Sequence, residues 1–190
     1  MLLIVAKLKR TLSARQFSQL LDRYDLGKKR STQLLKKTGV SVDGTVVIRP
    51  PFYFERGNLT LGRGVFINSG CVLLDQAPIV IGDDVMLGPQ VRLCTTTHDT
   101  RPDQRKTGHR HAPISIGHNA WLGAGVVVLP GVTIGANSVI AANSVVTQDV
   151  PENAMYAGAP ARFKKWLVEP VQSSSNPLVA AALPGVSDVL

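Results

Sequence analysis

Three of the four histidines of this 190-residue chain lie within one short segment, residues 95 to 113. His98 stands in the run TTTHD, and His109, Arg110 and His111 follow later in the segment. An imidazole with an ordinary pKa is largely neutral at physiological pH, so it can take the proton of a hydroxyl that attacks a carbonyl. The H-x-H spacing of His109 and His111 is also compatible with metal ligation. Histidine chemistry is therefore expected in this segment.

The scaffold that positions this segment is predicted by an aliphatic residue that recurs every six positions. These residues are Leu61, Ile67, Leu73, Ile81, Leu87, Leu93, Ile116, Leu122, Val128, Ile134, Ile140 and Val146. A small or apolar residue precedes each by two positions, and glycine often follows, as a corner requires. An amphipathic helix repeats at about 3.6 residues and a simple strand at about 2. The pattern instead predicts an all-β solenoid, a triangular prism of roughly four stacked coils.

The period is interrupted at two places. The step from Leu73 to Ile81 is eight residues and carries Asp75 and Gln76. The step from Leu93 to Ile116 is twenty-three, so the histidine segment is predicted to leave the prism as a loop at about residues 95 to 113. Insertions in solenoids often carry the functional residues.

The predicted solenoid spans residues 41 to 158 and forms the body of the chain. The two ends of the chain differ from it. Residues 1 to 40 hold ten basic residues and two acidic ones, which accounts for the whole net charge of +8. They are predicted to be helical and either to cap the prism or to touch an anionic membrane surface. The neutral body argues against a nucleic-acid partner. Residues 159 to 190 are predicted to form a short helix from Pro160 to Leu167 and a loosely held tail.

No signal peptide or membrane span is evident, and two cysteines are few for a disulfide scaffold. A cytoplasmic setting with free thiols at Cys71 and Cys94 is therefore expected.

Six stretches carry a resemblance to a known family. They are PPFYFERGN (50 to 58), INSGCVLLD (67 to 75), IGDDVMLGP (81 to 89), TTTHD (95 to 99), IGHNAWLGAGVVVLPGVTIGANSVIAANSVVTQDVP (116 to 151) and AGAPAR (157 to 162). With these motifs the chain resembles the hexapeptide-repeat acyltransferases, and within them the galactoside, maltose and nodulation-factor acetyltransferases. The resemblance implies a left-handed parallel β-helix, a homotrimer, and transfer of an acetyl group from acetyl-CoA to a sugar-type acceptor.

The resemblance also implies roles for individual residues. His98 matches the catalytic base, and Asn68, Asp75 and Glu55 match the surroundings of the acceptor. The residues that correspond to the acetyl-CoA groove are Ala124, Ala142, Thr147, Trp121, Arg162 and Lys165. Purely structural roles remain open for some of these residues. Asn68 could be a corner residue in the left-handed conformation, and Trp121 could pack outside the prism. Arg162 and Lys165 could lie on a solvated helix face.

Other functions also remain open. The segment from His109 to His111 departs from close relatives, which puts the acceptor in doubt, and an antibiotic or amino acid is an alternative. Carbonic anhydrases on the same fold bind zinc through three histidines, but the chain lacks their H-x4-H pair, so no metal is expected. A noncatalytic trimeric scaffold is the third possibility.

Overall fold

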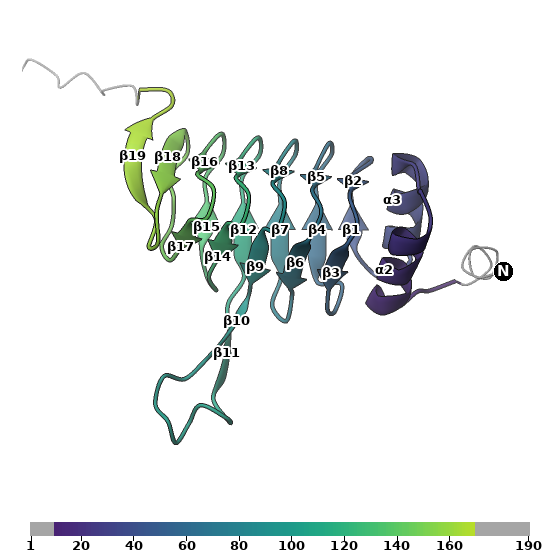
Figure 1. The fold of residues 1–190 in the computed structure, drawn as a ribbon, viewed down its shortest axis with the longest axis horizontal. Helices are drawn as coiled ribbons and strands as arrows, with labels where there is room; N and C mark the ends of the chain where they lie inside the picture. The colour runs from purple at the N-terminus through teal and green to yellow at the C-terminus, as the bar shows by residue number, and fades with distance from the viewer. Residues whose placement is uncertain (1–9, 170–190) are drawn as a thin grey trace, which may run out of the picture.

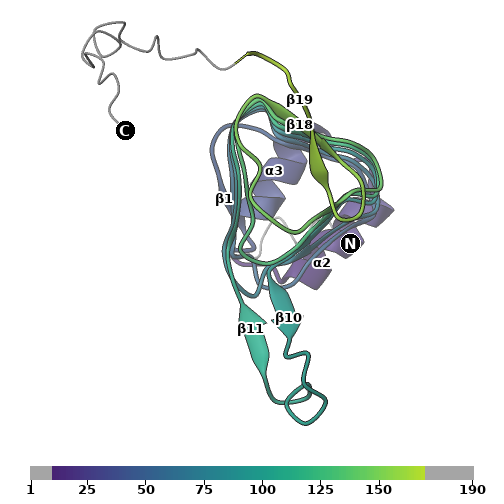
Figure 2. The same cartoon turned by 90° about the vertical axis from the view of Figure 1, so that its left-hand side faces the viewer.

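A computed structural model describes the protein over residues 10–169. Its body is a parallel β-solenoid with a triangular cross-section, consistent with the left-handed β-helix that the resemblance implied (Figures 1 and 2). The solenoid has about six turns, more than the four predicted. Residues 1–9 and most of the predicted tail lie outside the described residues.

Three sheets form the walls of the prism. The first contains β1 (Ser41–Val42), β4 (Leu59–Leu61), β7 (Ile79–Ile81), β12 (Ile114–Ile116) and β15 (Thr133–Ile134). The second contains β2 (Val47–Ile48), β5 (Phe66–Ile67), β8 (Met86–Leu87), β13 (Trp121–Leu122), β16 (Val139–Ile140), β18 (Ala154–Ala157) and β19 (Arg162–Trp166). The third contains β3 (Phe52–Phe54), β6 (Cys71–Leu74), β9 (Arg92–Cys94), β14 (Val127–Val128) and β17 (Val145–Val146).

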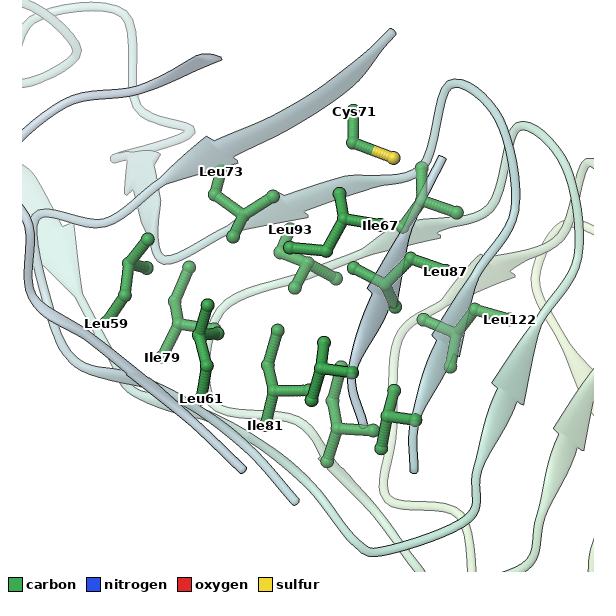
Figure 3. Close-up of a cluster of buried hydrophobic side chains, with 14 of the residues drawn as sticks. Leu59, Leu61, Ile67, Cys71, Leu73, Ile79, Ile81, Leu87, Leu93 and Leu122 are labelled. Carbon is green, nitrogen blue, oxygen red and sulfur yellow. The ribbon is translucent and has the colours of Figure 1, made fainter. Parts of the chain in front are cut away.

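The predicted aliphatic lattice forms the core of the prism. All twelve of its residues are buried, and they stack in register from one coil to the next, as Leu61, Ile81, Ile116 and Ile134 do in the first sheet. Figure 3 shows part of this cluster, with Cys71 at its edge. Burial raises the pKa of the thiols of Cys71 and Cys94, which suits packing more than reactivity. Both cysteines are free.

Two helices cover the open end of the first coil: α2 (Ala14–Arg23) and α3 (Lys28–Lys36) (Figure 1). Helix α2 buries Phe17 completely, and the ring of Phe17 meets that of Phe54 edge-on at 6.1 Å. In α3, the hydroxyl of Thr32 accepts a hydrogen bond from the Val46 backbone N–H at 3.1 Å. These contacts satisfy and cover an otherwise open coil edge, so the described part of the helical segment is a cap. A membrane contact of residues 1 to 40 stays a prediction.

The predicted helix from Pro160 to Leu167 is wrong. Residues Arg162–Trp166 form β19, which pairs antiparallel with β18 across the other end of the prism. This strand pairs with the exposed edge of the last coil, and such pairing outweighs local preference.

Among the described residues, no helix is both long and apolar enough to cross a bilayer.

Candidate active site

The histidine segment forms an antiparallel hairpin that projects from one corner of the prism (Figure 2). Its strands are β10 (Thr96–His98) and β11 (His109–His111), and they pair His98 directly with His109. Buried Thr95 fixes the hairpin to the solenoid: its hydroxyl donates to the Leu74 carbonyl at 2.6 Å and accepts from the Ala77 N–H at 3.0 Å. The segment expected to leave the prism as a loop is thus a hairpin that Thr95 ties to the neighbouring coil.

The His98 ring is held in one tautomer by its hydrogen bond. Its Nδ1 lies 3.0 Å from the carbonyl oxygen of Arg105. Because a carbonyl only accepts hydrogen bonds, Nδ1 must carry the proton in the neutral ring. The Nε2 atom then keeps its lone pair, which is the state that a general base requires.

The other two histidines of the hairpin lie beside His98. The ring centroid of His109 is 4.7 Å from that of His98, and His111 stacks 6.4 Å from His109. The Nδ1 atom of His111 is hydrogen-bonded to the Thr96 hydroxyl at 3.0 Å. The described residues contain no group of three or more His, Cys, Asp or Glu side chains that could hold a metal ion.

A pocket of about 410 Å³ opens between the hairpin and the corners of the two coils before it. It is lined by Glu55, Leu74, Gln76, Thr96, His98, His109 and His111. The Glu55 carboxylate accepts a hydrogen bond from the Gln76 amide at 3.1 Å. The structure thus brings Glu55 and His98 to one pocket and adds Gln76, for which the sequence pattern predicts no functional role.

Asp75 lies outside this pocket lining and is fully buried. Its carboxylate accepts hydrogen bonds from four consecutive backbone N–H groups, those of residues 55 to 58, at 2.6 to 2.9 Å. An acceptor molecule would have to break these bonds to reach it. The geometry therefore assigns Asp75 to holding the corner that carries Glu55, in place of the direct sugar contact that was expected.

A second pocket, of about 330 Å³, lies on the second sheet and its corner with the third. Its lining includes Asn68, Trp121 and Ala124, and it shares no residue with the hairpin pocket. Asn68 has no positive φ, so the left-handed role considered for it is wrong; its side-chain oxygen accepts from the Ser69 N–H at 2.8 Å. Trp121 is 49% exposed and points out from the prism.

Ala124 and Ala142 occupy successive corners of this same edge, one coil apart. The Asn143 N–H donates to the Ala124 carbonyl at 2.8 Å, and both alanines are exposed. Within residues 10–169, no protein acceptor takes the N–H of Ala124. Thr147, by contrast, follows β17, at the corner from which the hairpin leaves the third sheet.

Arg162 and Lys165 share one face of β19, although the strand replaces the expected helix. The pairing of β19 with β18 contains a bulge between Met155 and Tyr156. Arg162 therefore lies opposite Ala157, and Lys165 lies opposite Met155. Residues 155 and 157 are the outward positions of β18. The bulge thus keeps both basic side chains on the outer face at the C-terminal end of the prism.

Comparison with known proteins agrees with this architecture. The profile of the family described as "Bacterial transferase hexapeptide (six repeats)" matches residues 113–148. Nodulation protein L of Rhizobium leguminosarum is 45% identical over 133 residues, which are 69% of this chain and 70% of the relative. The chain belongs to the hexapeptide-repeat acyltransferase family.

Two further members of the hexapeptide-repeat acyltransferase family carry informative names. Galactoside O-acetyltransferase of Lactococcus lactis is 44% identical over 136 residues, 70% of this chain and 66% of the relative, so the chain spans just under two thirds of its length. A hexapeptide-repeat acetyltransferase of Vibrio cholerae, solved with acetyl coenzyme A, superposes with a TM-score of 0.77 at 36% identity. That match covers 82% of this chain and 86% of the solved one.

The four hydrogen bonds to Asp75 give a stability prediction. In Asp75→Asn the new amide nitrogen cannot accept, so up to two of the four N–H groups lose their partner. We expect the free energy of unfolding to fall by about 2–4 kcal/mol, measured by urea denaturation. Asp43→Asn is the control, because the Asp43 side chain is 75% exposed and should contribute little. A parent-like stability for Asp75→Asn would contradict this role.

Proposed function

We propose that the protein is an acetyl-CoA-dependent O-acetyltransferase that acetylates a hydroxyl of a sugar, oligosaccharide or polysaccharide precursor. The observation that supports the proposal most directly is the hydrogen bonding of His98 and the place of its ring in the pocket. Its Nδ1 is committed to the Arg105 carbonyl, and its ring lines a pocket with Glu55 and Gln76, two side chains that can bind hydroxyls. The names of the galactoside relative and of the acetyl-CoA complex support the substrate classes.

In the proposed reaction both substrates are bound together and transfer is direct. The Nε2 atom of His98 takes the proton of the acceptor hydroxyl as its oxygen attacks the thioester carbonyl carbon. The resulting oxyanion is stabilised by a backbone N–H, for which Ala124 is the candidate because its N–H has no acceptor within the described chain. Collapse of the intermediate breaks the C–S bond, and the imidazolium returns its proton to the departing thiolate.

The co-substrate is proposed to lie along the edge that carries Ala124 and Ala142. Small side chains there allow close approach of the pantetheine arm, and Trp121 forms a wall of the adjoining pocket. Thr147 stays a proposed contact from another corner. Arg162 and Lys165, on the outer face at the end of the prism, are proposed to bind phosphate groups of the co-substrate. A reducing cytoplasm, in which both cysteines stay thiols, is the proposed setting.

The two pockets lie on different edges of one chain, so we propose that a homotrimer unites them. The outward residues of the second sheet form an apolar row along the prism: Val47, Phe66, Met86, Trp121, Val139 and Met155. The corresponding row of the first sheet is mostly hydroxylic: Ser41, Thr60, Val80, Ser115 and Thr133. An apolar outer row favours burial against a neighbouring prism, whereas the hydroxylic row suits solvent.

The role of His98 is tested by His98→Ala. Loss of the general base should lower kcat at least about a hundredfold and leave the affinity for acetyl-CoA nearly unchanged. A thiol-release assay with a panel of sugar acceptors measures the first, and calorimetry the second. His118→Ala, which removes an exposed imidazole from outside the pocket, should keep full activity. Near-normal turnover of His98→Ala would refute the assignment.

The homotrimer is tested by a matched pair of substitutions. Met86 and Thr60 are both exposed and lie in adjacent coils, Met86 on the apolar row and Thr60 on the hydroxylic row. Met86→Glu should dissociate the trimer or weaken it strongly, because a buried unpaired carboxylate is costly, while Thr60→Glu should stay trimeric. Sedimentation equilibrium distinguishes the species. An active monomeric parent protein would overturn the proposal.

A further inference from the structure

Asp99 is the buried acid of an otherwise exposed hairpin. Its side chain is 6% exposed, although it follows exposed His98 and precedes the outermost turn. Two arginines cover it: Arg101 from the turn and Arg110 from β11. A carboxylate that is almost completely enclosed on a projecting hairpin must have strong partners, because an unpaired one would be costly.

Its contacts occupy both carboxylate oxygens. Oδ1 accepts from the Arg101 backbone N–H at 2.9 Å and from Arg101 Nε at 3.1 Å. Oδ2 accepts from Arg101 Nη2 at 3.2 Å and from Arg110 Nη2 at 2.8 Å. Asp99 therefore ties the turn to the opposite strand of the hairpin.

Hydrogen bonding from Arg101, and the charge of Arg110, lower the pKa of Asp99. The stabilisation that accompanies a lowered pKa is present above the unfolded-state value and is lost only as the pH falls through the folded-state value. The contacts are thus intact throughout the neutral range.

The turn that Asp99 holds carries the partner of His98. Arg101 Nη2 also donates to the side-chain oxygen of Gln104, and the Gln104 N–H donates to the Arg101 carbonyl at 3.1 Å. The Gln104 carbonyl in turn accepts from the Gly108 N–H at 2.7 Å. The next residue after Gln104 is Arg105, whose carbonyl binds Nδ1 of His98. Hydrogen bonds between Asp99 and Arg101 and between Arg101 and Gln104, followed by the peptide link to Arg105, therefore connect Asp99 to the imidazole.

The alternation along β11 explains why this arrangement leaves the pocket free. His109 and His111 line the pocket, while Arg110 between them does not. Successive side chains of a strand point to opposite faces. The imidazoles therefore occupy the pocket face, and the guanidinium of Arg110 reaches Asp99 away from it.

We infer that Asp99, held by Arg101 and Arg110, is a positioning residue that fixes the tautomer and orientation of His98 through the turn carrying Arg105. The inference rests on the proposed function for its kinetic consequence. Its structural consequence, the proton on Nδ1 of His98, is independent of any reaction.

The test uses the full-length protein with Asp99→Asn and Arg110→Gln. Asp83→Asn is a matched control, since Asp83 also accepts from an arginine side chain at 2.8 Å and from that arginine's backbone N–H at 2.9 Å, but lies away from the hairpin. Long-range proton–nitrogen NMR of histidine-labelled protein reports the His98 tautomer, with His98→Ala used to assign its signals. Thiol release gives kcat and the KM for acetyl-CoA, and thermal melting reports the fold.

We expect Asp99→Asn to lose the single Nδ1-protonated form of His98 and to lower kcat about tenfold, with an unchanged KM for acetyl-CoA. Arg110→Gln, whose parent side chain is 71% exposed, should shift both readouts in the same direction and decides the question if Asp99→Asn does not fold. The control should match the parent protein.

A parent-like tautomer and kcat in both folded variants would overturn the inference. Absence of thiol release from the parent protein itself would instead refute the proposed function, and a tautomer change in Asp99→Asn would still support the positioning role.

Discussion

The parallel stacking of coils around the aliphatic core is the constraint on which the rest of this structure depends. Each coil must place its inward residues directly above those of the coil before it, as Leu73 and Leu93 do. Extra residues inside a strand would shift this register and turn apolar side chains outward. Insertions are therefore tolerated only at corners, and the histidine hairpin leaves and rejoins the prism at one of them.

The same stacked coils anchor both sides of the site. The hairpin starts from buried Thr95, whose hydroxyl bridges the chain segments on the neighbouring coil. The facing wall is set by Asp75, which holds four backbone N–H groups and so fixes the corner that carries Glu55. The hairpin histidines therefore face a wall whose backbone is held by hydrogen bonds, and general-base chemistry depends on such positioning.

Much of this architecture could be predicted from the sequence, because the inward residues of a solenoid recur at a fixed interval along the chain. The core lattice and the projecting segment followed directly. The predicted count of four coils leaves out the first one, although Val42, Ile48 and Phe54 are also spaced by six, because the next step, to Leu61, is seven. The strand β19 was read as a helix because its local sequence has no strand period and its conformation is set by pairing with β18.

Side-chain direction at the corners was harder to predict than the coils themselves. Asp75 and Gln76 are adjacent in the eight-residue step, yet one is buried beneath the backbone and the other lines the pocket. Periodicity assigns inward and outward positions only along strands, and a corner has no such rule. The role of Asp99 could likewise not be predicted from the six-residue period, since its partners come from both sides of the hairpin.

We propose that an active site forms only where the hairpin of one subunit meets the Ala124 edge of its neighbour. The most direct test mixes two inactive variants, His98→Ala and Ala124→Glu, by joint unfolding and refolding. If the claim holds, random trimers will contain intact composite sites, and about a quarter of the parental thiol-release activity should return. If each site lies within one subunit, every site in the mixture carries one lesion, and the absence of any recovery from correctly assembled mixed trimers would contradict the account.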